Sequence, residues 1–273
     1  MAIVTISREL AALGDEIARE LAKHLNYRFV DRFKLEECIK GYGVTKQKLE
    51  KYDERKPSFF ASLSQDRDDY LHYLKSAVLS EAKDGNCVVT GRGAFAILDG
   101  LPGVLPVYLV SSKEVRVARV KSYFHCDEKR ALQIISQSDQ DRIGFHKYFF
   151  EVDWRDPSNY QLTINTSHLH PLACAELIKN LLSNTINSGT EDAFKIRMKD
   201  LLLAQRIIHH VLYEQGIAIH FLEASVSLGN ACLFGVASSA SIADAAINAA
   251  REVPSIEGVK SEIQVVHEYS VMP

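Results

Sequence analysis

Short apolar segments alternate with amphipathic helical patterns up to about residue 187, and this alternation constrains the fold more than any other feature. The apolar segments predict strands at residues 2–7, 27–30, 86–90, 104–110 and 161–165. They are apolar almost throughout rather than at every second residue, which is typical of parallel strands covered on both faces. Strands that alternate with helices predict right-handed crossovers, and therefore a doubly wound parallel sheet of the α/β class.

The segments between the strands predict helices over residues 15–25, 66–83, 113–123, 127–136 and 171–186. In the first of these, Ile17, Leu21 and Leu25 recur at intervals of four residues and share one face. Ligands of doubly wound folds bind beyond the carboxyl ends of the strands. We therefore expect ligand-binding residues at 7–14, 31–32, 91–93 and 111–112.

Composition narrows the range of partners. The net charge of −3 offers no general attraction for nucleic acid, so we expect no nucleic-acid partner. The five cysteines are dispersed and none has CxxC spacing, which favours reduced thiols in a cytoplasmic protein and no metal site. No charged leader with an apolar core precedes the first strand, and no apolar run is long enough to cross a bilayer, so we expect no signal peptide and no transmembrane segment.

The pattern changes after residue 183. Residues 184–190 are polar and predict a linker between a first domain (1–187) and a second domain (191–273). The second domain reads as a helix at 198–214, strands at 218–227 and 231–236, a helix at 242–252 and a strand at 259–267. Gly229–Asn230 between two apolar segments predicts a hairpin turn. A small α+β domain is expected.

The turn after the first strand, SRELAALGDE at residues 7–16, has the position of a phosphate-binding loop without its usual residues. Such a loop reads G-x-x-x-x-G-K-[ST], because glycines bring N–H groups to the phosphates, lysine neutralises charge and the hydroxyl holds Mg²⁺. Aligned to this pattern, Arg8 and Leu13 replace the two glycines and Gly14 replaces the lysine. The layout predicts a phosphate site whose chemistry has been largely lost.

Three blocks of the first domain resemble the cytidylate kinase-like family, which is related to the P-loop nucleoside monophosphate kinases. The first block begins with TISRE at residues 5–9, continues through the helix that follows and ends with VDR at residues 30–32. The other two are VVTGRGAFAIL at residues 88–98 and DPSNYQLTINTS at residues 156–167. The family typically reads S-R-E-Y-G-S-G-G-R-E in the loop, so LAAL here replaces Y-G-S-G and Asp15 replaces arginine. The resemblance implies a P-loop kinase fold and, in an active protein, ATP- and Mg²⁺-dependent phosphoryl transfer to a nucleoside monophosphate such as CMP.

The resemblance places the phosphates of ATP at the first loop. The residues concerned are Ser7, Arg8, Glu9, Leu13, Gly14, Asp15 and Glu16. Two acids in the first helical turn suit the helix dipole but repel phosphate, unless Mg²⁺ bridges them with Glu16 as a ligand. Alternatively, Asp15 simply caps the helix. Arg8 would supply the charge of the missing lysine, or else forms an ion pair with Glu9 or Asp31.

The acceptor nucleotide is placed by resemblance at Asp31, Arg32, Gly91, Arg92 and Gly93. Arg32 would contact the acceptor phosphate and Asp31 its sugar or base; the alternative is a turn that merely ends the strand. An arginine between two glycines at the carboxyl end of a strand has few packing reasons to exist, which favours ligand binding by Arg92.

The candidate catalytic cations are Arg8 and four residues of the expected lid, Arg116, Arg119, Arg142 and Lys147. Arg116 and Arg119 lie three residues apart on one helix face, and the segment around Arg142 resembles the R-D-x-x-D-x-x-R lid of cytidylate kinases. Cations of a lid stabilise charge on the transferred phosphoryl group. The alternative is a solvated helix face.

The second domain resembles a BON domain through the stretch VSLGNACLFGVASSASIADAAINAAREVPSIEGVKSEIQVV. Other BON proteins are associated with membranes or phospholipids, but no basic stripe supports lipid binding here. A regulatory module, or one that binds a protein partner or a second copy of the chain, is favoured. Three functions stay open: an active kinase, an inactive nucleotide sensor that signals through the second domain, and a scaffold.

Overall fold

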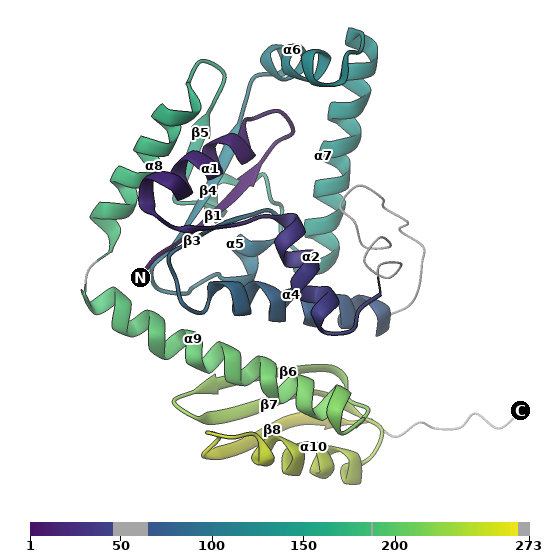
Figure 1. Cartoon of the computed structure of the whole chain (residues 1–273). Coiled ribbons are helices and arrows are strands. Elements are labelled where there is room, and N and C mark those ends of the chain that lie inside the picture. The colour runs from purple at the N-terminus through teal and green to yellow at the C-terminus, as the bar shows by residue number, and fades with distance from the viewer. Residues whose placement is uncertain (46–64, 187, 267–273) are drawn as a thin grey trace, which may run out of the picture. The chain divides into compact units, whose positions relative to one another are not determined.

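A computed structural model describes residues 1–45, 65–186 and 188–266, which divide into two compact units, 1–191 and 192–273. The described part of unit 1 contains a parallel sheet in the order β2-β3-β1-β4-β5 (Figure 1). The strands are β1 (Ile3–Arg8), β2 (Arg28–Val30), β3 (Cys87–Thr90), β4 (Val104–Val110) and β5 (Leu162–Asn165). All five predicted strands are confirmed, and so is the doubly wound fold.

Helices cover both faces of this sheet, as its apolar strands predict. On one face, α1 (Gly14–Leu25) and α8 (Pro171–Thr185) lie side by side, with Ile17 and Ile178 buried against β4 (Figure 1). On the other face, α5 (Ala94–Ile97) and a cluster around Trp154 pack on Tyr108 of β4. The other helices in the described part of unit 1 are α2 (Arg32–Gly41), α4 (Gln65–Ala82), α6 (Lys113–Phe124) and α7 (Glu128–Phe150), with a 3-10 turn at Pro157–Asn159.

The helices of unit 1 differ from the prediction in two places. The helix expected at 127–136 continues to Phe150 as α7, because Phe145, His146 and Phe149 give its second half a buried face. Helix α2 was not predicted at all. It begins directly after β2, where the Asp31 carboxylate accepts a hydrogen bond from the Lys34 amide at 3.0 Å and so caps the helix.

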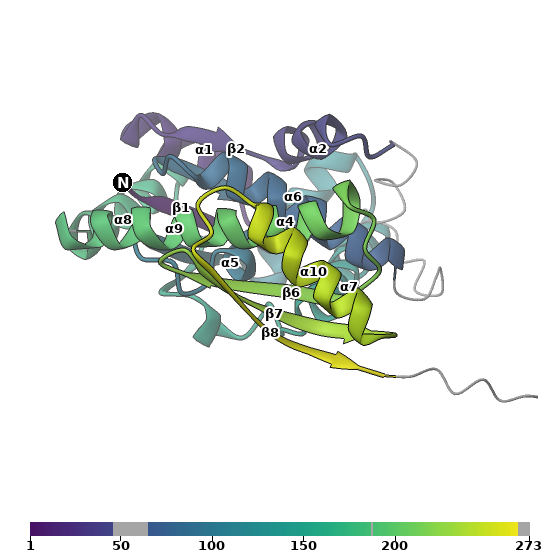
Figure 2. The same cartoon turned by 90° about the horizontal axis from the view of Figure 1, so that it is seen from below.

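Unit 2 has the predicted α+β pattern. Its described elements are α9 (Ser188–His209), which begins shortly before the unit boundary, a π-helical turn (His210–Glu214), β6 (His220–Ser227), β7 (Asn230–Ala237), α10 (Ala240–Glu252) and β8 (Gly258–Val265). Figure 2 shows β7 between β6, which is antiparallel to it, and β8, which is parallel. Four alanines of α10 (Ala243, Ala246, Ala249 and Ala250) are buried in the core of the unit, so this helix lies close to the sheet.

The turn and the linker of this region differ in detail from their predictions. The hairpin is confirmed, but its central residues are Leu228 and Gly229, both at positive φ, as in a type I′ turn. The linker is shorter than the predicted 184–190, because α8 ends at Thr185 and α9 already begins at Ser188. Residue 187 lies outside the described residues.

Candidate functional site

The loop after β1 keeps the backbone of a glycine-rich turn although its glycines are missing. Ala11 and Leu13 have φ angles of 63° and 59°, in the left-handed region that favours glycine. These are two of the positions at which the family has glycine. Leu13 is the N-cap of α1, so the prediction that Asp15 caps this helix is wrong. The loop therefore keeps the backbone form of a phosphate loop, and this form has an energetic cost because two residues other than glycine adopt the left-handed conformation.

Two arginines of α6 hold the loop by its carbonyl groups. Arg116 Nε donates to the Leu10 carbonyl at 2.9 Å, and Arg119 Nη1 donates to the Ala11 carbonyl at 2.9 Å. Arg116 also pairs with Glu9 at 3.3 Å and with Asp139 at 2.7 Å. The predicted shared face is confirmed, but it lies against the loop rather than in solvent, with Arg116 buried and Arg119 half-buried.

These contacts use much of the hydrogen-bonding capacity of both guanidinium groups. Arg119 also reaches the residue after β5, since its Nη2 donates to the Thr166 carbonyl at 2.9 Å. Glu9 accepts a further hydrogen bond from the Ser111 amide at 3.0 Å. Ser7 is buried and hydrogen-bonds Tyr160. The structure thus gives Glu9, Arg116 and Arg119 roles in holding the loop. The predicted contact of these residues and of Ser7 with phosphates stays a prediction.

Arg8 is the last residue of β1, and its side chain lies against two glycines, Gly14 at the start of α1 and Gly91 after β3. A Cβ atom on Gly14 would meet Arg8 Cγ at 2.4 Å, and one on Gly91 would meet Arg8 Nη1 at 2.4 Å. Both glycines therefore make room for this side chain. Arg8 Nη2 pairs with Asp15 Oδ1 at 3.3 Å, so the alternative of a pair with Glu9 or Asp31 is wrong. Asp15 partly neutralises the cation that was expected to replace the lysine.

The second acid of the first turn has a structural partner. Glu16 accepts a hydrogen bond from the Tyr123 hydroxyl at 2.9 Å, and this bond raises the pKa of Tyr123. Within the described ranges no three His, Cys, Asp or Glu side chains gather as a metal site. With Glu16 bound to Tyr123 and Asp15 to Arg8, the loop does not fit the donor set of a resident Mg²⁺.

Arg92 has the packing role that its position between glycines did not reveal. Its side chain is 3% exposed, with Nη2 at 2.6 Å from Glu36 Oε1 and Nη1 at 3.2 Å from the Tyr70 hydroxyl. The same Glu36 oxygen accepts from Arg32 Nε at 2.6 Å. The inference that Arg92 lacks packing partners is wrong, because α2 and α4 surround it. Gly93 is at φ 68°, and a Cβ there would meet the Phe150 ring.

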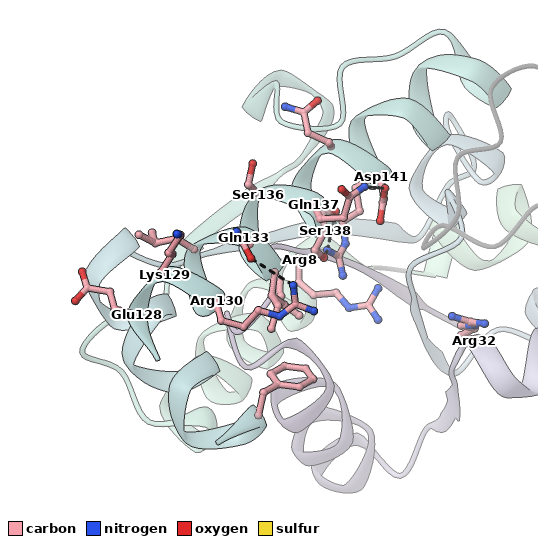
Figure 3. A pocket seen from close by; sticks show the side chains of 16 residues that line it. Arg8, Arg32, Glu128, Lys129, Arg130, Gln133, Ser136, Gln137, Ser138 and Asp141 are labelled. Carbon is pink, nitrogen blue, oxygen red and sulfur yellow. Dashed lines mark hydrogen bonds between the residues drawn. The ribbon is translucent and has the colours of Figure 1, made fainter. Parts of the chain in front are cut away.

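A pocket of about 1250 Å³ lies beyond the carboxyl end of β1, between the loop and α7 (Figure 3). Among the described residues that line it, the cationic ones are Arg8, Arg32, Lys129, Arg130 and Arg142, and the acidic ones are Glu128 and Asp141. Asp141 is buried and accepts a hydrogen bond from Gln137 at 2.7 Å. The excess of cations makes this pocket a candidate anion site.

The pocket brings together only part of the predicted set. Arg8, Arg32 and Arg142 line it, whereas the buried Arg92 and the exposed Lys147 are not among its described lining residues. Arg142 also bonds to the carbonyl and hydroxyl of Ser138 one turn earlier. Sequence reasoning missed Lys129 and Arg130. The adjacent Lys-Arg pair, two residues after the helix-capping Asp127, was a signal that could have revealed them.

The parallel sheet, the glycine-like loop at the end of β1 and the cationic pocket beside it define a P-loop kinase-type unit. The model of the cytidylate kinase-like family matches residues 3–168, and the chain belongs to this family. The model of the BON domain matches residues 199–267.

Curated relatives and one solved structure are similar to unit 1. Proteins named cytidylate kinase are 26% identical in Pyrobaculum calidifontis (69% of this chain, 96% of the relative) and in Methanocaldococcus jannaschii (68% and 98%). The crystal structure of an uncharacterized protein from Eubacterium ventriosum has a TM-score of 0.53 at 20% identity, over 67% of this chain and 99% of that one. This structural likeness supports the fold alone. None of the helices described in the structure is long and apolar enough to span a bilayer.

Proposed function

We propose that unit 1 binds a nucleotide, with its phosphates in the cationic pocket. The observation that carries this proposal is the convergence of five cations, from the end of β1 and from α2 and α7, on one cavity. Arginine suits phosphate because its planar guanidinium donates two parallel hydrogen bonds. Proteins of this family are nucleotide kinases, and a nucleotide is the ligand with the matching charge.

Phosphoryl transfer is less well supported than binding. It depends on positioning and on cations that stabilise the transferred group. The loop lysine is absent, Arg8 is paired with Asp15, and Arg116 and Arg119 hold the loop. We therefore propose a nucleotide sensor with slow or no transfer. ATP-dependent transfer to a CMP-like acceptor, with Mg²⁺ carried by the nucleotide, is the second candidate, and family membership favours it.

Binding is tested by titration calorimetry of the full chain with ATP. Arg142→Gln is expected to weaken ATP binding about fivefold, since one cation near a phosphate contributes about 1 kcal/mol. Arg155→Gln is the matched control, because Arg155 is exposed, pairs with Asp153 and is not among the described lining residues. Added salt is expected to weaken binding to the unchanged protein. Absence of heat with ATP would contradict the proposal.

A coupled assay for ADP release from ATP and CMP separates the two candidates. A sensor is expected to bind ATP without turnover above the background of the assay. Turnover that requires CMP and disappears in Arg8→Gln would instead support the kinase.

Unit 2 is proposed as the module through which the nucleotide-bound state reaches a partner. Among the described strands of its sheet, β6 and β8 are the outer ones, and Val265 and Val266 at the end of β8 are 39% and 54% exposed. Exposed strand edges are common sites of pairing with another chain. Binding of a protein partner or of a second copy of this chain through unit 2 stays a prediction. A cytoplasmic location of the protein also stays a prediction.

A further inference from the structure

We propose that Phe124, Arg130 and Gln133 form a subsite in which the nucleobase of a nucleoside triphosphate stacks, with its phosphates directed toward Arg8. All three residues line the cationic pocket. The inference rests on the proposed function, because it requires a nucleotide in this pocket. It adds the position of the base, which the first loop does not determine.

Phe124 is the residue that carries the inference. It is the last residue of α6, lines the pocket and remains 56% exposed. The preceding Tyr123 is tied to α1 through its hydrogen bond with Glu16, so the end of α6 is held beside the loop. An exposed ring in a partly apolar cavity can gain stabilisation by stacking on a flat ligand.

Arg130 and Gln133 supply the polar contacts of a base. Arg130 Nη1 donates to Gln133 Oε1 at 3.3 Å, and the Arg130 amide is bound to the Asp127 carboxylate at 2.7 Å. Both side chains come from the first turns of α7, so they keep a defined place relative to Phe124. A guanidinium stacks on aromatic faces, and an amide pairs with the hydrogen-bonding edge of a base.

The distribution of charge gives the direction of the ligand. In the view of Figure 3, Arg8 lies between Arg130 and the more distant Arg32. Arg8 is the last residue of β1, and Arg32 begins α2 two residues after the end of β2, so both lie where the sheet ends. Phosphates therefore match the part of the pocket near the sheet, and the base matches the end of α6. Other aromatic side chains fit this role less well: Trp154 is buried, and Tyr148 stacks with Arg67.

The test compares ATP with inorganic tripolyphosphate, by calorimetry on the full chain. Phe124→Ala is expected to weaken ATP binding about fivefold or more, as base–aromatic stacking predicts, and to leave tripolyphosphate binding unchanged. Phe124→Trp is expected to restore ATP binding. Phe33→Ala is the matched control, because Phe33 is 71% exposed in the same unit but is not among the described lining residues.

The outcomes separate this inference from the proposed function. If ATP and tripolyphosphate both bind but Phe124→Ala affects ATP no more than Phe33→Ala does, the base subsite is wrong and the anion site stands. An equal loss for both ligands in Phe124→Ala also overturns the subsite, because it indicates damage to the phosphate end. If neither ligand binds to the unchanged protein, the proposed function and the subsite both fail.

Discussion

Replacing Arg92 with methionine is expected to lower the free energy of unfolding of unit 1 by about 3 kcal/mol without weakening ATP binding. Arg92 is buried and paired with Glu36, and its guanidinium also lies 6.0 Å from the ring centre of Phe145. Its removal leaves Glu36 with less compensation and the Tyr70 hydroxyl with one partner fewer. Methionine keeps the length of the side chain, so the loss is mainly that of charge and hydrogen bonds.

Urea unfolding followed by the fluorescence of Trp154 measures this effect. Trp154 is the single tryptophan of the chain and is buried in unit 1, so its signal reports on this unit. Arg32→Met is the matched control, because Arg32 shares the Glu36 oxygen but its side chain is 28% exposed and lines the pocket. We expect Arg32→Met to cost about 1 kcal/mol or less and to weaken ATP binding. If Arg92→Met leaves the free energy of unfolding unchanged but abolishes ATP binding, the structural role is wrong and Arg92 is instead a ligand-binding residue.

Replacing Asp15 with lysine is expected to tighten ATP binding about thirtyfold. The substitution changes the local charge by two and releases Arg8 from its partner at 3.3 Å. Each unit of charge close to a phosphate contributes at least about 1 kcal/mol in water, and about 2 kcal/mol corresponds to a factor of about thirty. The opposing cost of a cation in the first helical turn affects folding by about 0.3–1 kcal/mol but is the same with and without ligand.

The control for this substitution is Glu20→Lys, which makes the same change of charge farther along α1, where Glu20 lies 4.0 Å from His24. We expect it to change ATP affinity about threefold or less, because screening reduces the effect of a distant exposed charge. Calorimetry at a fixed salt concentration compares the two variants. An unchanged or weaker affinity in Asp15→Lys would mean that phosphate does not approach the first loop.

The strands were accessible from sequence because a local pattern determines them. Each predicted strand is a short apolar run, and the structure differs from the prediction by one residue or less at the ends of most of them. The length of α7 was not accessible in this way, since its second half is held by aromatic packing with Phe95 and Trp154, which lie elsewhere in the chain. Helix α2 was missed because its capping residue, Asp31, was interpreted only as a ligand or a turn.

For the candidate site too, some features were determined by the sequence and others only by the tertiary structure. Sequence alone determined that the loop lacks its lysine and two of its glycines, and that arginines follow several strands, because residue identity sets which charges and backbone angles are available. Only the tertiary structure decided how these arginines are used. Arg92, Arg116 and Arg119 are satisfied by contacts with residues distant in sequence, whereas Arg8, Arg130 and Arg142 line a pocket. An ion pair or a cavity depends on distances between separate elements, and only the packing of those elements sets such distances.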